Sequence, residues 1–313
     1  MKAILLAGAG GTEQLQYTTL PVPEPGPGEV RLRVRALSVN PVDVKTRKGG
    51  AFFSKLQEAP PAILGWDVSG VVDALGEGVA GVGIGDALFG MINFPGSGRC
   101  YAEYVVAPVA HLARKPEAIT HEAAAATTLA ALTAWQVLVH EAGLQRGQRV
   151  LVHAAAGGVG HFAVQIARHL GATVVGTAST ANQEFLRTLG VDEPVDYSAV
   201  DIRDAVVPVD VVLDPIGGDT TLQSLRLLRP GGILVSIVGG AKEPVLAAAS
   251  ESGVTAKNYL VHSSGADMEA LAGLLSSGAL KPQVESRFPF EEMAAAHAQI
   301  ETGRTRGKVI VLP

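Results

Sequence analysis

A glycine-rich turn between an apolar segment and a helix-forming segment is the first feature of this sequence that points to a chemistry. Residues 150–160 read Val-Leu-Val-His-Ala-Ala-Ala-Gly-Gly-Val-Gly, and a Gly-x-Gly-x-x-Gly pattern falls on Ala155, Gly157 and Gly160. Glycine at 157 lets the backbone approach a pyrophosphate, and glycine at 160 lets helix and strand pack closely. The helix N-terminus adds free N–H groups that attract phosphate. The predicted dinucleotide contacts are Ala156, Gly157, Gly158, Val159 and Gly160.

The alternative is a glycine-rich turn that binds no ligand, because Ala155 departs from the pattern. The strand before the turn and the helix after it favour the dinucleotide site. Two further apolar strands end in small residues, at Gly217 and at Val238-Gly239, and doubly wound sheets bind ligands outside such strand ends. We therefore add Val238 and Gly239 to the predicted cofactor contacts, with ordinary strand-to-loop turns as the alternative.

The residues after the second strand of this region favour NADPH over NADH. An NAD enzyme needs Asp or Glu about 20 residues after the glycine motif, to bind the ribose 2′-hydroxyl. Here the chain reads Ser179-Thr180-Ala181-Asn182 and has no carboxylate before Glu184. The side chains of Ser179, Thr180 and Asn182 can donate to a 2′-phosphate without repelling it. The next cation, Arg187, lies about one turn further and has a solvated side chain as its alternative.

The composition excludes several classes of partner. Hydrophobic residues make up 47% of the 313 residues and charged residues 18%, which is too apolar for a disordered chain. A net charge of −5 without a long basic run argues against nucleic acid or an anionic membrane as partner. The single cysteine, Cys100, excludes an internal disulfide and fits a cytoplasmic location. The apolar stretches 1–6 and 123–139 are predicted as a strand and a buried helix.

Two patterns of secondary structure must position these residues. Up to residue 120, short strands alternate with Gly- and Pro-rich turns, which is typical of a β-rich domain. Beyond it, strands alternate with helices, which is typical of a doubly wound parallel sheet. The predicted strands are 30–39, 68–75, 101–107, 149–154, 173–176, 209–213, 232–238, 284–288 and 308–312. The predicted helices are 121–142, which begins after a Thr120 cap, and 159–170, 182–189, 220–228, 268–276 and 290–302.

With these elements in place, the sequence resembles the medium-chain dehydrogenase/reductase superfamily along nearly its whole length, most closely its zinc-independent quinone oxidoreductase branch. Besides the glycine-rich turn, the motifs are Ser-Val-Asn-Pro-Val-Asp (38–43), Gly-Trp-Asp-Val-Ser-Gly (65–70), Leu-Thr-Ala-Trp (132–135), Asp-Tyr (196–197) and Gly-Arg-Thr-Arg-Gly-Lys (303–308). The resemblance implies an α/β fold, in which a Rossmann doubly wound parallel sheet is joined to a chaperonin-10 (GroES)-like β-barrel catalytic domain. It predicts the catalytic domain at 1–120 and 263–313, and the NADP-binding domain at 121–262.

Compared residue by residue with this superfamily, the chain lacks the zinc ligands. Zinc-dependent relatives carry Cys near the position of Asn40 and a His-Glu pair where this chain has Trp66-Asp67, and the four-Cys lobe is also absent. Because a catalytic zinc usually takes three protein ligands, no metal site is predicted. Without a metal, the hydride acceptor must itself be electrophilic, as a quinone or an enone is.

The resemblance also implies roles for residues of the catalytic domain. Asn40 is expected beside the nicotinamide and the substrate, where its amide orients the acceptor carbonyl. Lys45 is expected to stabilise negative charge that develops on the product. The alternatives are an Asn40 that only stabilises its turn and a Lys45 that is only solvated. No general acid is predicted, so solvent supplies the proton.

Further cofactor contacts are implied by the same resemblance. Thr133 is expected near the nicotinamide, with helix packing as its alternative, and Tyr197 near the adenosine phosphate. Lys308, which closes the last motif, is also counted among the cofactor contacts. Gln183 departs from the family, because several relatives have Lys there for the 2′-phosphate.

The resulting hypothesis is a zinc-independent oxidoreductase that transfers a hydride from NADPH to a quinone or a related conjugated carbonyl compound. Two alternatives stay open: an NADPH-dependent alkenal/enone double-bond reductase, and a non-catalytic dinucleotide-binding structural or regulatory protein. The predicted partner is a small molecule. The resemblance further implies a homodimer, formed through a sheet edge near 233–238.

Overall fold

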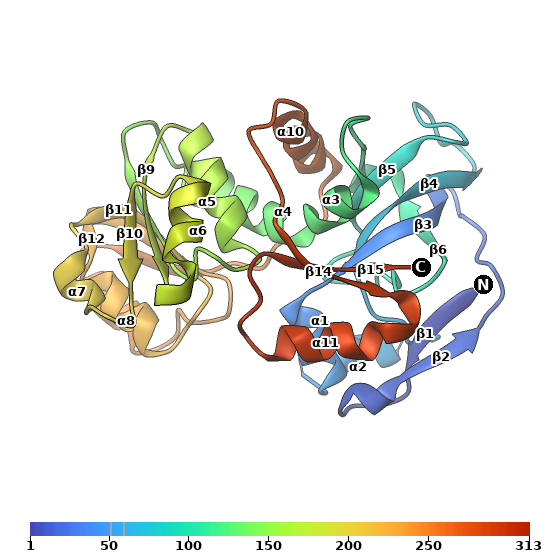
Figure 1. Ribbon diagram of the computed structural model, residues 1–313, viewed down its shortest axis with the longest axis horizontal. Coiled ribbons are helices and arrows are strands. Elements are labelled where there is room, and N and C mark those ends of the chain that lie inside the picture. The colour runs from blue at the N-terminus through green and yellow to red at the C-terminus, as the bar shows by residue number, and fades with distance from the viewer. Residues whose placement is uncertain (51, 59) are drawn as a thin grey trace. The chain divides into compact units, whose positions relative to one another are not determined.

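The chain folds into two compact units, as the computed structural model shows for residues 1–50, 52–58 and 60–313 (Figure 1). The first unit comprises Met1–Leu132 and Val261–Pro313, and the second comprises Thr133–Leu260. The first boundary therefore lies later than residue 120, because the helix that begins at His121 packs within the first unit. Its Ala125 and Ala126 form a buried apolar cluster with Ala36 and Ile310.

The first unit is built around one mixed sheet. Its strand order is β14-β15-β3-β4-β5-β7, with β6 paired to β3 outside this path, while β1 and β2 form a separate antiparallel pair. These strands are β1 (Lys2–Leu6), β2 (Leu15–Thr19), β3 (Glu29–Val39), β4 (Asp67–Leu75), β5 (Ala87–Met91), β6 (Tyr104–Pro108), β7 (Leu112–Arg114), β14 (Val284–Pro289) and β15 (Lys308–Leu312). The helices are α1 (Pro41–Arg47), α2 (Phe53–Gln57), α3 (His121–Ala126), α10 (Gly265–Ser276) and α11 (Met293–Glu301), with 3-10 turns η1 (Thr12–Gln14), η2 (Val109–His111) and η5 (Phe290–Glu292).

Strand β3 organises this unit. Its alternating sequence buries Val30, Leu32 and Val34 in the core and turns the intervening arginines outward. At its end, Ser38 pairs with Asp67 of β4, and Val39 pairs with Val309 of β15. This register brings the start of β4 and the start of β15 to the residue that follows β3, which is Asn40.

The predicted helix over 121–142 is three shorter segments: α3, α4 (Leu129–Trp135) and the π-helical η3 (Gln136–Glu141). The predicted cap is confirmed, because Thr120 Oγ1 accepts a hydrogen bond of 3.1 Å from the Ala123 N–H. The helix is interrupted after α3, where the Leu129 N–H donates to Asp67 Oδ1 at 2.9 Å. Since an acidic side chain of β4 captures this N–H, the chain starts a new helix there.

The second unit is a doubly wound parallel sheet, which confirms the predicted α/β fold. Its strand order is β10-β9-β8-β11-β12-β13, and every pair in it is parallel. The strands are β8 (Arg149–Val152), β9 (Thr173–Ala178), β10 (Glu193–Asp196), β11 (Val209–Asp214), β12 (Leu228–Ser236) and β13 (Thr255–Asn258). The helices are α5 (Gly160–His169), α6 (Gln183–Leu189), α7 (Ile202–Ala205), α8 (Asp219–Leu225) and α9 (Val245–Glu251), with the 3-10 turn η4 (Thr180–Asn182).

One prediction about this sheet is wrong. The segment near 233–238 was expected to form its edge, but residues 233–236 of β12 pair with Thr255–Asn258 of β13. The apolar pattern of β12 reflects its burial between two neighbouring strands, and the edge strand on this side is β13. In the described parts of the chain, no helix combines the length and the apolar character that a membrane crossing needs.

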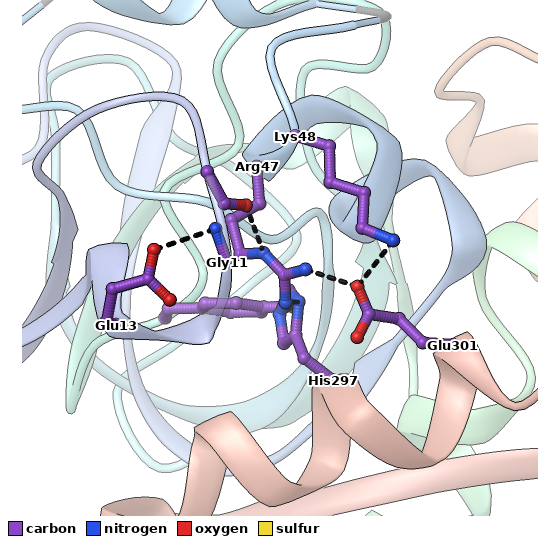
Figure 2. A network of polar contacts seen from close by, with 8 residues as sticks. Gly11, Glu13, Arg47, Lys48, His297 and Glu301 are labelled. Atoms are coloured by element: carbon purple, nitrogen blue, oxygen red, sulfur yellow. Dashed lines mark hydrogen bonds and ion pairs between the residues drawn. The ribbon is translucent and has the colours of Figure 1, made fainter.

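A buried arginine ties three segments of the first unit together (Figure 2). Arg47, at the end of α1, is 1% exposed, and its Nε donates to the Gly10 carbonyl at 3.2 Å. Its Nη2 pairs with the carboxylate of Glu301 on α11, which also binds Lys48 Nζ at 2.8 Å. A buried guanidinium without its partner is costly, so this ion pair holds α1, α11 and the N-terminal loop in place.

We expect Glu301→Gln to lower the free energy of unfolding by about 1 to 2 kcal/mol, because Arg47 would keep a hydrogen bond but lose its counter-ion. Urea unfolding followed by circular dichroism measures the change. Glu184→Gln is the matched control: it removes the exposed pair between Glu184 and Arg187, and should change stability by less than about 0.5 kcal/mol. Equal stability of the wild type and the Glu301 variant would contradict this role of the pair.

Candidate active site

The glycine-rich turn lies between β8 and α5, at the carboxyl end of a central strand. A Cβ on Gly160 would clash with the Ala154 carbonyl oxygen and lie 2.7 Å from the Ala155 Cα, so only glycine allows this approach of helix to turn. Ala155 replaces the first glycine of the motif without strain, because it faces Gly176, whose missing side chain leaves room for the methyl group. Residues 157–159 are partly exposed at the N-terminal end of α5. The turn therefore has the shape and the helix dipole of a phosphate site.

A buried histidine that sequence analysis passed over supports this turn from inside the sheet. His153 Nε2 lies 2.8 Å from Ser224 Oγ, and His153 Nδ1 lies 3.2 Å from Thr177 Oγ1. Ser224 donates its own hydrogen to the Thr220 carbonyl, so His153 Nε2 is the donor to Ser224. Burial lowers the pKa of His153 to about 4, which keeps the imidazole neutral. The only sequence signal for this role is a histidine at the end of an apolar strand.

The residues expected to select the cofactor lie together after β9. The Asn182 amide donates to Ser179 Oγ at 3.4 Å, and the Thr180 hydroxyl donates to the Asp196 carboxylate and lowers its pKa. This carboxylate belongs to the end of the neighbouring strand β10, so the polar cluster contains one negative charge that sequence spacing did not reveal. Tyr197 follows it and is 57% exposed.

Two nearby side chains expected to assist or weaken phosphate binding have local partners. Arg187 pairs with Glu184 at 3.3 Å, and both side chains are exposed. Gln183 is the first residue of α6, and its side-chain amide donates to the Ala178 carbonyl at 3.0 Å. The cluster around Ser179 therefore offers neutral hydrogen-bond donors close to one acidic group.

The ends of β11 and β12 form tight polar turns beside each other. Asp214 Oδ1 accepts hydrogen bonds from the Ile216 and Gly217 N–H groups at 2.8 and 3.0 Å. Ser236 Oγ accepts from the Gly240 N–H at 2.9 Å, across the predicted contacts Val238 and Gly239. Val238 is 40% exposed, so this strand end is open at the side chain expected to meet the cofactor.

In the first unit, the predicted catalytic residue Asn40 is part of a buried charged cluster. Its Nδ2 donates to Asp67 Oδ2 at 2.7 Å, and its Oδ1 accepts a short hydrogen bond from Lys308 Nζ. Asp67 and Lys308 are 3.6 Å apart, and their side chains are 0% and 3% exposed. An amide NH2 carries two hydrogens, and within the described residues the bond to Asp67 uses one of them. Lys308, predicted as a cofactor contact, is thus placed to act through Asn40.

A second carboxyl group completes the cluster. Asp43, on the first turn of α1, accepts the Asn40 N–H at 2.7 Å through Oδ2 and is 0% exposed. Burial raises the pKa of Asp43 to about 7, against the opposing effects of the Asn40 N–H and Lys308. Burial also lowers the pKa of Lys308. Asp43, Asp67 and Lys308 thus share one buried site. One carboxylate there is enough to neutralise the charge of the Lys308 ammonium.

The other predicted residues have plainer surroundings. Lys45 lies on α1 and is exposed, and Thr133 is buried within α4. Cys100 is fully buried and burial raises the pKa of its thiol, which makes it a poor nucleophile. Among the described residues, no group of three or more His, Cys, Asp or Glu side chains is arranged to hold a metal ion.

A separate cavity of about 630 Å³ opens on the first unit. It is lined by residues from the start of the chain, the Pro-rich segment after β2 and the loop before β6, including Met1, Pro23, Arg99 and Tyr104. None of the predicted site residues lines it, so it is distinct from the Asn40 cluster.

Comparison with known proteins places this geometry in a family. A family model described as an alcohol dehydrogenase GroES-like domain matches residues 26–117, and one described as a zinc-binding dehydrogenase matches residues 189–311. The structure of the quinone oxidoreductase from Coxiella burnetii superimposes with a TM-score of 0.94 at 37% identity, covering 100% of this chain and 99% of that one.

Two curated relatives extend the comparison. The synaptic vesicle membrane protein VAT-1 homolog of Homo sapiens is 35% identical, over 100% of this chain and 86% of its own length. The chloroplastic NADPH-dependent alkenal/one oxidoreductase of Arabidopsis thaliana is 33% identical, over 100% of this chain and 80% of its own length. The similarity to both relatives therefore spans the two units.

We expect Gly160→Ala to weaken dinucleotide binding at least tenfold, about 1.4 kcal/mol, because the new methyl group would push α5 away from the turn. Titration of the protein with NADPH, followed by nicotinamide fluorescence, measures the loss. Gly273→Ala in α10 is the control, since a Cβ there meets no atom within 4 Å. Unchanged affinity in a folded Gly160 variant would show that this close approach is not needed.

Proposed function

Because the chain belongs to the medium-chain dehydrogenase/reductase superfamily, in its zinc-independent branch, we propose that it is an oxidoreductase that uses NADPH to reduce quinones or related conjugated carbonyl compounds. The observation that carries the proposal is the glycine-rich turn, whose Gly160 can bear no side chain and whose helix α5 begins at the carboxyl end of a parallel sheet.

A nicotinamide dinucleotide fits the residues of the second unit. The proposed pyrophosphate site is the turn 156–160, and the proposed ribose site is formed by Ser179, Thr180 and Asn182. Thr133, Tyr197, Val238 and Gly239 complete the proposed contacts. When bound, the reduced nicotinamide supplies the hydride. The preference for NADPH rests on the neutral donors that follow β9, where the sequence has no carboxylate. The carboxylate of Asp196 lies beside Thr180 and limits that preference.

The side chains of the first unit suit an acceptor that is already electron-poor. The residues at the zinc-ligand positions of relatives are Asn40, Trp66 and Asp67, and the Asp67 carboxylate is committed to Asn40, Leu129 and Lys308. Hydrogen bonds must then polarise the acceptor, and a quinone or an enone needs less help than a ketone. We propose that the second hydrogen of the Asn40 side-chain amide polarises the acceptor carbonyl. Lys45 would stabilise negative charge on the product.

Reduction of a quinone to a hydroquinone consumes one hydride, which carries two electrons, and one proton from solvent. The second candidate is an alkenal or enone double-bond reductase, which the similarity to the alkenal/one oxidoreductase favours. The same residues would serve it, with the hydride going to the β-carbon. A cytoplasmic location and a homodimer complete the proposal, with the edge strand β13 as the sheet edge available to a second copy.

Consumption of NADPH against a panel of p-quinones, enones and simple alcohols, with and without a chelator, tests the proposed function. We expect turnover with quinones or enones, none with alcohols, and no effect of the chelator. Rates with quinones and enones rank the two reductase candidates. Binding of NADPH without turnover on any acceptor would favour a non-catalytic protein, and inhibition by the chelator would contradict the metal-free reaction.

We expect Gln183→Lys to raise the preference for NADPH over NADH by about tenfold, because an ammonium near Ser179 would attract the 2′-phosphate and offset Asp196. The ratio of kcat/KM for the two cofactors measures this preference. Arg187→Gln serves as the control, because Arg187 is already paired with Glu184. An unchanged ratio in the Gln183→Lys variant would place the 2′-phosphate elsewhere.

A further inference from the structure

A chain of buried polar side chains begins at the Arg47–Glu301 ion pair and continues through helix α11 (Figure 2). Arg47 Nη1 lies 3.4 Å from His297 Nδ1, and His297 Nε2 lies 2.9 Å from the Tyr101 hydroxyl. These three side chains are at most 1% exposed. Burial raises the pKa of the Tyr101 phenol, and the nearby carboxyl group of Asp43 raises it further. This chain of hydrogen bonds thus leads from the ion pair toward Asp43, the acid that binds the backbone N–H of Asn40.

Chemistry allows only one direction for these hydrogen bonds. A guanidinium donates and cannot accept, so His297 Nδ1 is the acceptor and Nε2 carries the hydrogen. The imidazole is neutral, because burial and the nearby Arg47 lower the pKa of His297 to about 3. His297 therefore donates to the Tyr101 oxygen, and the Tyr101 hydrogen must point to another acceptor.

The carboxyl group of Asp43 lies close enough to interact with the Tyr101 hydroxyl, since it raises the pKa of the phenol, and it can therefore accept that hydrogen. Its Oδ2 binds the Asn40 N–H at 2.7 Å, while its Oδ1 is buried and makes no other hydrogen bond within the described part of the chain. A carboxylate can accept from both Tyr101 and Asn40. A protonated Asp43 would direct its own hydrogen against one of these donors, so the direction imposed by Arg47 favours the carboxylate.

Several charged or titratable groups surround Asp43. Burial and Asp67 of β4 favour its protonated form, while the Asn40 N–H and Lys308 of β15 favour the carboxylate. Cys100 lies close as well and is held as a neutral thiol. The effects that favour the protonated form are the stronger ones, and they raise the pKa of Asp43 to about 7. Both forms are therefore populated near neutral pH, so one hydrogen bond from the Tyr101 hydroxyl can decide between them.

We propose that Arg47, His297 and Tyr101 are positioning residues, whose one-directional chain of hydrogen bonds keeps Asp43 an acceptor and so holds Asn40 in place for hydride transfer. This inference rests on the proposed function, because it concerns the same site. The activity should fall as the pH drops through the titration of Asp43, since the protonated acid no longer accepts from both neighbours. Removal of the Tyr101 hydroxyl should move that loss to higher pH.

The test is Tyr101→Phe, which removes one oxygen and leaves the ring. We expect the acid limb of the kcat/KM profile to move up by about 1 to 2 pH units, as the loss of one hydrogen bond to a charged group predicts. NMR of protein labelled with 13C at the aspartate carboxyl follows Asp43 directly, with Asp43→Asn to assign its signal. This titration should move upward by the same amount. Tyr104→Phe is the control, because Tyr104 lies outside the chain of hydrogen bonds.

Substitutions of His297 provide a second test that keeps Tyr101. In His297→Gln, the amide oxygen can accept from Arg47 and the amide nitrogen can donate to Tyr101, so the wild-type profile should be retained. His297→Leu can do neither, and should move the profile as Tyr101→Phe does. Equal profiles for the Gln and Leu variants would overturn the inference.

The two readouts separate this inference from the proposed function. An Asp43 signal that titrates identically in the wild type and in Tyr101→Phe overturns the inference, whatever the activity. A wild-type protein that reduces no acceptor overturns the proposed function, while the NMR titration still reports on the chain. In Asp43→Asn, the further substitution Tyr101→Phe should leave the pH profile unchanged, because its target is gone.

Discussion

The first unit depends on one constraint: two carboxyl groups and one ammonium are buried next to the amide of Asn40. Charged groups out of water are stable only when they are paired and hydrogen-bonded. Asp67 meets this need by binding Asn40, Lys308 and the Leu129 N–H. These three partners come from the end of β3, the start of β15 and the start of α4. One dry carboxylate thus sets the register of two strands and the start of a helix.

Asp43 is a second buried acid, and the same cluster stabilises its negative charge only in part. The single ammonium of Lys308 faces both acids, so the second negative charge depends on hydrogen bonds. The Asn40 N–H supplies one of these, and the chain that begins at Arg47 leads to the other. The site that would handle the acceptor is therefore held by a balance of burial and hydrogen bonding, in place of the rigid ligand set that a metal would impose.

In the second unit, the main constraint is the close approach of the backbone of helix α5 to the backbone of the glycine-rich turn. Gly160 lets α5 begin against the Ala154 carbonyl, and the neutral His153 links the turn to β9 and α8. A turn held in this way keeps one shape before the proposed dinucleotide binds. Such preorganisation reduces the entropy lost on binding.

Local patterns in the sequence determined the glycine turn of the second unit, the alternation of β3 and the Thr120 cap, because each depends on residues a few positions apart. The tertiary structure alone decided which strand forms the sheet edge, where the helix after Thr120 breaks and what surrounds Asn40. Asn40 and Lys308 are 268 positions apart, and no periodicity records such a contact. Burial of charge selects partners in space, so this part of the site emerges only when the whole unit folds.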